Sequence, residues 1–292
     1  MGAPQYSLIT CTTGRREELR RLLDSLVAQD VQEFELVVVD QGPAGCLDRL
    51  IDEFKFCFSI QHLRSTPGLS RSRNLGIRHA RGEFLGFPDD DCWYPTDVVA
   101  RVTVRRRENP TLDLMLGKTV DEKGSDSLGS FRRKSGAVSK WNVWTSGNSS
   151  SIFVRRQLAI DAGGFDETLG VGANTRFQSG EETDFILRIL AAGTPAYYDS
   201  ELKIHHPQVD CSISRAQAYS PGFGRVLRKH RYGVLYLLYR VVRTAVSCVL
   251  AAAVLDSGRV RYKSLWAVGT LQGYWAKYDD TSKAWPVRED CF

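Results

Sequence analysis

The chain has 292 residues, a formal net charge of +5, and 42% hydrophobic and 25% charged residues. These fractions are ordinary for a globular protein, and the length can bury one large core, so we expect one α/β domain, alone or with an appendage. Seven scattered cysteines without a Cys-x-x-Cys pair argue for reduced thiols and against a disulfide framework or a zinc site.

The charge is unevenly distributed along the chain. From Pro221 onward there are 12 Lys and Arg against 5 Asp and Glu, whereas the first 220 residues are close to neutral. A basic tail on a near-neutral body indicates an anionic partner surface, either phospholipid headgroups or nucleic acid. The first residues lack the basic and apolar regions of a secretory signal, so we expect the protein to work in the cytoplasm.

The first ninety residues alternate apolar runs with amphipathic segments. The apolar runs predict strands at residues 6–11, 34–39, 58–63 and 84–87, with helices at 16–28, 47–54 and 69–80 between them. This order predicts an α/β fold with a mostly parallel sheet and helices on both faces. In such sheets, ligands bind beyond the carboxyl ends of the strands.

Polar residues follow three of these strands, namely Thr10 with Thr12, then Asp40, then the run from Asp89 to Asp91. Three adjacent carboxylates raise one another's pKa unless a cation lies among them. A hard divalent cation with oxygen ligands supplies that charge, and phosphate and water can fill its other positions. A solvated acidic turn is the alternative, but a buried strand that ends in Asp-x-Asp favours a metal–nucleotide site.

Side-chain alternation at a strand end places Asp89 and Asp91 on one side and Asp90 on the other. A metal can therefore use the outer pair or the last residue, which leaves another carboxylate for a ribose hydroxyl.

The second half of the chain is predicted in the same way. Helices are expected at residues 96–108, 157–162 and 181–192, strands at 112–116, 152–154, 195–198 and 202–204, and loops at 121–138 and 165–179. The loop at 165–179 is of the kind that orders over a substrate.

The region from 221 to 255 has a helical and apolar pattern. If it is one helix, Arg225, Lys229, Arg240 and Arg243 lie near a single stripe, which suits either the interface of an anionic leaflet or a solvated face of a helix packed on the body. The longest charge-free run, 244–255, is shorter than the roughly 20 residues that a membrane span needs. We therefore expect a catalytic domain at 1–210 and a basic, amphipathic helical extension at 211–292, for which membrane association is one of the two alternatives.

The ordered set of motifs resembles a bacterial family 2 glycosyltransferase with the GT-A fold. The matching segments are 9–12, 36–40, 68–77, 89–91, 163–167, 180–184 and 205–207. The resemblance implies inverting, metal-dependent transfer of a sugar from a nucleotide-sugar donor, with a UDP-sugar favoured. The implied acceptor is a carbohydrate or polyprenyl-linked molecule in surface polysaccharide biosynthesis, and the implied location is the inner face of the cell membrane.

The resemblance also implies roles for individual residues. The nucleotide sugar would be bound by Thr10, Thr12, Arg15, Asp40, Arg73, Asp89, Asp90 and Gly147. Mn²⁺ or Mg²⁺ would be held by Asp89, Asp91 and the histidine after the last core strand, where His206 matches better than His205. The catalytic base would be Glu182, with Glu181 and Asp184 as alternatives.

The base is where this chain departs from the family pattern, because Glu182 replaces the commoner Asp. A carboxylate that takes the proton of the acceptor hydroxyl raises the reaction rate by about 10²- to 10⁴-fold. Acids in the first turn of a helix are also favoured by its dipole alone, which is the alternative reading of this cluster.

Four other functions compete with a transferase. A haloacid-dehalogenase phosphatase would carry its Asp-x-Asp after the first strand, and a sugar nucleotidyltransferase would carry a Gly-rich, Arg-containing loop there. A catalytically silent subunit that binds nucleotide sugar or membrane as a scaffold need not keep both acidic clusters. No interleaved aromatic and basic motif supports a nucleic-acid partner, so none is expected.

Overall fold

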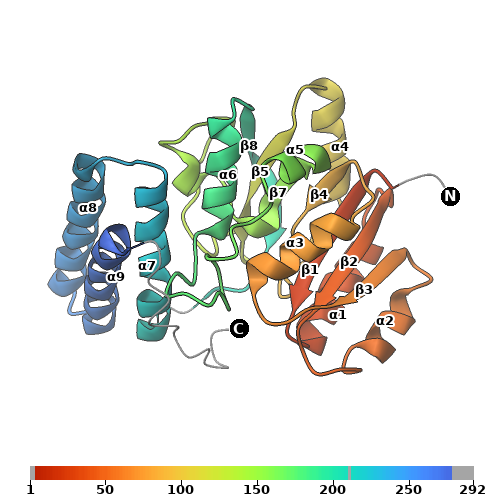
Figure 1. Ribbon diagram of the computed structural model, residues 1–292, viewed down its shortest axis with the longest axis horizontal. Coiled ribbons are helices and arrows are strands. Elements are labelled where there is room, and N and C mark those ends of the chain that lie inside the picture. Colours follow the sequence, from red (N-terminus) through yellow and green to blue (C-terminus); the bar gives the residue numbers. More distant parts are fainter. Residues whose placement is uncertain (1–3, 210–211, 278–292) are drawn as a thin grey trace. The chain divides into compact units, whose positions relative to one another are not determined.

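The computed structural model describes residues 4–209 and 212–277, which form two compact units (Figure 1). The first unit comprises the described residues up to Pro67 together with Arg71–Gly164 and Phe185–Val209. The second comprises Gly68–Ser70, Phe165–Asp184 and the described C-terminal residues from 212 onward. The predicted domain boundary at 210–211 lies outside the described residues, so the division into 1–210 and 211–292 stays a prediction.

The first unit holds every strand that the structure describes. Its elements are β1 (Tyr6–Thr12), α1 (Arg16–Val27), β2 (Phe34–Asp40), α2 (Asp48–Phe54), β3 (Ser59–Arg64), most of α3 (Leu69–His79), β4 (Phe84–Gly86), α4 (Val98–Glu108), β5 (Leu114–Val120), β6 (Gly136–Val138), β7 (Ile152–Arg155), α5 (Arg156–Asp161), most of α6 (Glu181–Ala191) and β8 (Ala196–His205). The second unit adds α7 (Ile213–Lys229), α8 (Val234–Ala253) and α9 (Ser257–Trp275).

The strands form one sheet in the order β3-β2-β1-β4-β7-β5-β8-β6. Strands β1 to β4 are parallel to one another, and β5 is parallel to β8. Strands β7 and β6 run antiparallel to their neighbours. The predicted mostly parallel α/β sheet is confirmed, and the carboxyl ends of β1, β2 and β4 lie at one edge.

Helices cover both faces of the sheet, as predicted. On one face, buried side chains of α1, α2 and α4 join those of the sheet in a single apolar core. On the other face, α3 approaches so closely that a Cβ at Gly76 would lie 2.3 Å from Ile9 Cγ2. There Phe185 of α6 packs edge-on against Phe87, with the ring centroids 6.3 Å apart.

Two sequence-based boundaries were wrong. The segment predicted as the loop 121–138 ends in strand β6, which pairs with β8. The predicted strands 195–198 and 202–204 are one strand, β8. Its polar centre stays in the sheet because buried Asp199 is bound by Arg105, with Nε to Oδ2 at 3.0 Å, and by Arg101.

The C-terminal region is also not one helix. A turn that includes Arg231, with a φ of 53°, and Gly233 separates α7 from α8, so the predicted stripe of arginines and lysine on one helix was wrong. Among the described helices, α8 is long and apolar enough to cross a membrane by length and composition, with a mean hydropathy of 1.6. The charge-free run at 244–255 underestimated the length of this apolar helix, because α8 continues through Arg240 and Arg243.

Five cysteines lie in the described residues as free thiols: Cys11, Cys46, Cys57, Cys92 and Cys248. Cys211 and Cys291 lie outside the described residues.

Glu35 links three strands through its fully buried carboxylate. It accepts hydrogen bonds from Ser7 Oγ at 2.7 Å, Gln61 Nε2 at 3.0 Å, and the backbone N and Nε of Arg81 at 2.7 and 2.8 Å. Burial by itself raises the pKa of Glu35, but these donors outweigh burial and the pKa is lowered.

We predict that Glu35→Gln lowers the free energy of unfolding by about 1–3 kcal/mol at neutral pH. The amide nitrogen of the glutamine is a hydrogen-bond donor, and it would face groups that are themselves donors. The stabilisation by Glu35 is complete above its unfolded-state pKa and is lost as the pH falls through the lowered folded-state pKa. Urea unfolding at pH 7 and pH 3.5 should show the difference between variant and wild type shrink in acid. Exposed Glu122→Gln serves as the control, and an equal loss in both variants would contradict the assignment.

Candidate active site

A backbone bridge fixes the acidic loop that follows β4. Trp93 N donates to His205 O and His205 N donates to Trp93 O, both at 3.0 Å, which pairs the loop with the end of β8. The Trp93 indole stacks on the His205 ring with centroids 5.3 Å apart and planes 11° apart. The Arg21 guanidinium lies 4.0 Å from the Trp93 ring and donates from Nη2 to Asp91 O at 3.0 Å.

The bridge brings Asp91 to His206, the residue after β8. Asp91 Oδ1 lies 3.1 Å from His206 Nε2. On the other side of the ring, Nδ1 lies 2.6 Å from Pro207 O, and because a carbonyl oxygen only accepts, Nδ1 carries the proton. The other ring nitrogen, Nε2, is the one that faces the Asp91 carboxylate.

The two groups shift each other's pKa. Burial by itself raises the pKa of Asp91, but the hydrogen bond and charge of His206, followed by Arg15, lower it to about 2. Burial by itself lowers the pKa of His206, but Asp91 outweighs burial and the pKa is raised. Each group therefore favours the charged form of the other.

Asp90 turns away from this pair and toward Arg15, at the start of α1. Arg15 Nε donates to Asp90 Oδ2 at 3.1 Å, its Nη2 pairs with Oδ1, and its Nη1 reaches Asp91 Oδ2 at 3.2 Å. Burial raises the pKa of Asp90 to about 6, against the opposing charge of Arg15. A cation from the chain itself thus lies among the three carboxylates.

Asp89 faces a third direction, toward α3 and a serine turn. It accepts from Arg73 Nη2 at 2.9 Å, Ser150 Oγ at 2.7 Å and Ser149 Oγ at 3.2 Å. Arg73 is 2% exposed, so its charge is held at this site by the fold. The two serines were not predicted as site residues, although the Ser-rich run before β7 was visible in the sequence.

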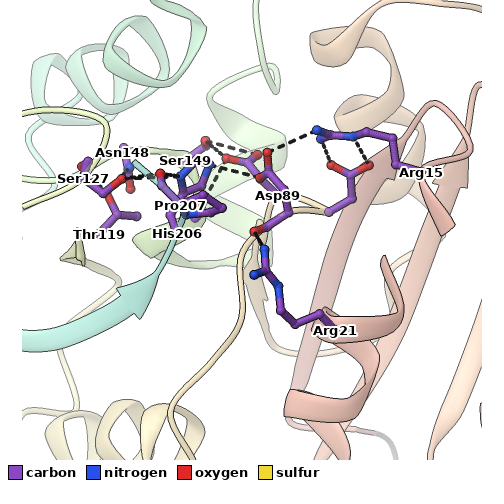
Figure 2. A network of polar contacts seen from close by, with 12 residues as sticks. Arg15, Arg21, Asp89, Thr119, Ser127, Asn148, Ser149, His206 and Pro207 are labelled. Atoms are coloured by element: carbon purple, nitrogen blue, oxygen red, sulfur yellow. Dashed lines mark hydrogen bonds and ion pairs between the residues drawn. The ribbon is translucent and has the colours of Figure 1, made fainter. Parts of the chain in front are cut away.

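The network continues from His206 into neighbouring loops (Figure 2). Ser127 Oγ donates to Pro207 O at 2.7 Å, Thr119 Oγ1 donates to Ser127 O at 2.6 Å, and Asn148 Nδ2 donates to Thr119 Oγ1 at 2.9 Å. These bonds tie the His206–Pro207 segment to the loop after β5 and to the turn before β7.

Of the three predicted metal ligands, the structure therefore brings two together. Among the described residues there is no group of three or more His, Cys, Asp and Glu that could hold a metal. Asp91 and His206 still fit two positions of a divalent ion, because adjacent ligands of an octahedral ion with bonds of about 2.1 Å lie about 3 Å apart. The other positions would be left to phosphate and water.

The remaining predicted donor-binding residues lie at the same sheet edge. Asp40 is fully buried, accepts from Gly42 N at 2.8 Å, pairs with Arg64 and lies 3.4 Å from His62 Nε2. Arg64 and His62 on β3 were not foreseen, because only the tertiary register of β2 and β3 shows them.

Two threonines and a glycine complete this set. Thr12 Oγ1 accepts from the backbone N of Gly14 and Arg15 at 3.2 and 3.3 Å. Thr10 Oγ1 is buried without a hydrogen-bond partner among the described residues. Gly147 has a φ of 135°, and a Cβ there would lie 3.0 Å from Leu116 Cβ, so glycine is required.

The candidate bases lie in the second unit, in the first turn of α6. Asp184 is fully buried and pairs with Lys229 Nζ at 2.7 Å and His230 Nε2 at 2.8 Å. Glu181 is buried near the backbone of Gly170, whereas Glu182 is half-buried. The charge of Asp184 is therefore balanced by Lys229 and His230 within the second unit.

Comparison with known proteins decides the family. The family model described as Glycosyl transferase family 2 matches residues 7–161, more than half of the chain. The chain belongs to glycosyl transferase family 2. The match includes the acidic loop and the strands up to β7, and membership makes the chain a glycosyltransferase.

Two curated relatives illustrate the range of similarity. An uncharacterised glycosyltransferase of Haemophilus influenzae is 24% identical over 217 residues, which cover 71% of this chain and 68% of that protein. A PGL/p-HBAD biosynthesis glycosyltransferase of Mycobacterium tuberculosis is 32% identical over 127 residues, 41% of this chain and 48% of that protein. The chain thus spans only about half of the second relative.

Solved structures support the fold. The Staphylococcus aureus protein TarS, residues 1–349, gives a TM-score of 0.61 at 19% identity, over 98% of this chain and 76% of that one. The mannosyltransferase PcManGT of Pyrobaculum calidifontis, solved with GDP-Man and Mn²⁺, gives a TM-score of 0.64 at 18% identity, over 94% and 88%. The expected GT-A fold is confirmed.

We predict that Trp93→Leu lowers the free energy of unfolding by about 1–3 kcal/mol, because the stack on His205 and the Arg21 contact are both lost. Urea unfolding measures the change. The matched control is Trp141→Leu, since Trp141 is 63% exposed, and it should be close to neutral. Equal stability of both variants would show that the stack contributes nothing to holding the acidic loop.

Proposed function

We propose that this glycosyltransferase moves a sugar, with inversion, from a nucleotide-sugar donor to a carbohydrate or polyprenyl-linked acceptor in surface polysaccharide biosynthesis. A UDP-sugar is the favoured donor, and Mn²⁺ or Mg²⁺ is the proposed cofactor. The observation that carries the proposal is the Asp91–His206 pair at the carboxyl edge of the sheet, in a chain of this family. Neighbours in fold were solved with UDP-GlcNAc and with GDP-Man and Mn²⁺, which supports a nucleotide-sugar donor.

The residues at the sheet edge suit the parts of such a donor. Asp91 and His206 would hold the metal, which when bound stabilises the charge of the leaving diphosphate as a Lewis acid. Arg73, fixed by Asp89, offers a buried positive charge for base or phosphate. Asp40 is the proposed contact of the base, and its carboxylate is already held by Gly42 N, Arg64 and His62.

The remaining step is proton transfer from the acceptor. The acceptor oxygen forms the new bond to the anomeric carbon as the bond to the diphosphate breaks, and Glu182 takes the hydroxyl proton. Glu182 is the proposed base, with Glu181 as the nearest alternative. Asp184 is the least suited, because Lys229 and His230 already balance its charge.

The proposed location is the cytoplasm, at the inner face of the cell membrane. The support is the strongly basic composition of the helical region after residue 212 and the apolar helix α8.

We predict that wild type binds one nucleoside diphosphate among UDP, GDP and dTDP in a Mn²⁺- or Mg²⁺-dependent way. Asp91→Ala and His206→Ala should each weaken that binding by at least about 10- to 100-fold, because each removes a proposed metal ligand. Isothermal titration calorimetry with and without metal measures the effect.

The matched control is Asp24→Ala, an exposed aspartate on α1, which should bind as wild type does. Absence of any nucleotide binding with either metal would contradict the transferase proposal. Binding without hydrolysis or transfer would favour the silent scaffold.

We predict that Glu182→Gln lowers the rate of donor hydrolysis or transfer by about 10²- to 10⁴-fold, with the donor Kd unchanged, because only the proton acceptor is lost. Asp184→Asn should instead lower the free energy of unfolding by about 3–5 kcal/mol, because it breaks a buried ion pair. Release of nucleoside diphosphate and thermal unfolding distinguish the two effects. Full activity of Glu182→Gln together with an inactive Glu181→Gln would move the role to Glu181.

A further inference from the structure

Helix α8 presents its apolar side to solvent. Leu235, Leu238, Val242, Val246, Val249 and Leu250 recur at intervals of three and four residues and so share one side of the helix. All six are exposed, from 49% for Leu238 to 84% for Leu235. These six residues are called the outer face below.

The opposite side of α8, which packs on α7 and α9, is the more polar one. Arg240 lies 4.6 Å from the Phe223 ring, and Cys248 Sγ donates to Val260 O at 3.7 Å. Helices of water-soluble proteins turn the apolar stripe to the core and the polar residues outward. The reversed orientation of α8 therefore indicates that its outer face has an apolar partner.

The charges around the outer face indicate which partner this is. Between residues 213 and 277 the sequence has eleven Lys and Arg and one acid, Asp256. Arg243 on α8 and Arg259 and Arg261 at the start of α9 are exposed. Two copies of this chain joined through their outer faces would bring like charges together, whereas an anionic lipid surface offers apolar chains and negative headgroups at once.

We propose that the outer face of α8 docks on an anionic lipid bilayer, with its six apolar side chains among the acyl chains and the arginines at the headgroups. This inference deepens the proposed function and rests on it only for the biological setting of a lipid-linked acceptor. The contact is an apolar insertion on one side of α8 and differs from the single stripe of basic residues that the sequence suggested.

The helix lies in the plane of the membrane and does not cross it. Leu237 and Ala251, near its two ends, are 1% and 3% exposed, so α8 is held against its unit near both ends. Helix α9 packs against both α7 and α8 (Figure 1). A crossing α8 would draw Arg259 and Arg261 on α9 toward the hydrocarbon, at a high cost in free energy.

The test is flotation of the full chain with sealed vesicles of phosphatidylglycerol and phosphatidylcholine. Wild type should float with these vesicles and bind phosphatidylcholine alone more weakly. The variant Leu235→Ser/Val242→Ser/Val249→Ser should lose about 100-fold in partition coefficient, because three inserted apolar groups are removed. The variant Arg243→Gln/Arg259→Gln should lose about fivefold per charge, and only on the anionic vesicles.

Two controls separate this test from folding and from the donor site. Phe56→Ser/Val104→Ser removes exposed apolar side chains of the first unit and should float as wild type does. The triple serine variant should keep the wild-type circular dichroism spectrum and the wild-type Kd for nucleotide. Flotation then reports on membrane docking and the Kd reports on the donor site, so the two failures are distinguished.

Three results would overturn the proposal. The first is a wild type that does not float, or a triple serine variant that floats equally well. The second is a triple variant that converts a dimer to a monomer by light scattering with vesicle binding unchanged, which would assign the face to a second copy. The third is a wild type that resists alkaline carbonate extraction, which would mean that α8 crosses the bilayer.

Discussion

The candidate site depends on the pairing of Trp93 with His205. Two backbone hydrogen bonds and a ring stack join the acidic loop after β4 to the end of β8, two segments that are far apart in the sequence. Without this bridge, Asp91 of the first segment and His206 of the second would not be held within reach of one metal ion. With it, Asp91 and His206, each one or two residues from the bridge, face each other.

The acidic loop also needs its charge to be balanced before any ligand arrives. The three aspartates turn to three different partners, Asp90 to Arg15, Asp91 to His206 and Asp89 to Arg73. Each partner comes from a different element, so the fold itself compensates most of the repulsion among the carboxylates. A nucleotide-sugar donor and its metal would compete with these partners for the carboxylates. Because the partners already hold the aspartate side chains in place, the arrangement favours a preorganised site.

Most of the fold of the first unit could be predicted from the sequence, because apolar runs and helical spacings indicate most of its elements, and the strand ends indicate where polar residues gather. The partners of the aspartates could not be predicted, since the Arg15–Asp90 pair and the serines around Asp89 depend on tertiary packing. The same holds for strand β8. In the sequence, Asp199 suggests a break between two strands, and only the structure shows that Arg105 pairs with its buried carboxylate. In the second unit, the apolar pattern predicted helices but not which side of α8 faces outward.

The proposed donor site has the Asp91–His206 pair at its metal end. Pulsed electron paramagnetic resonance of Mn²⁺ bound to the full chain with nucleoside diphosphate tests it most directly, because a histidine ligand couples its nitrogen nucleus to the ion. Wild type should show a nitrogen coupling that disappears in His206→Asn and persists in His79→Asn, which changes an exposed histidine of α3. A Mn²⁺–nucleotide complex of wild type without any nitrogen coupling would contradict the claim.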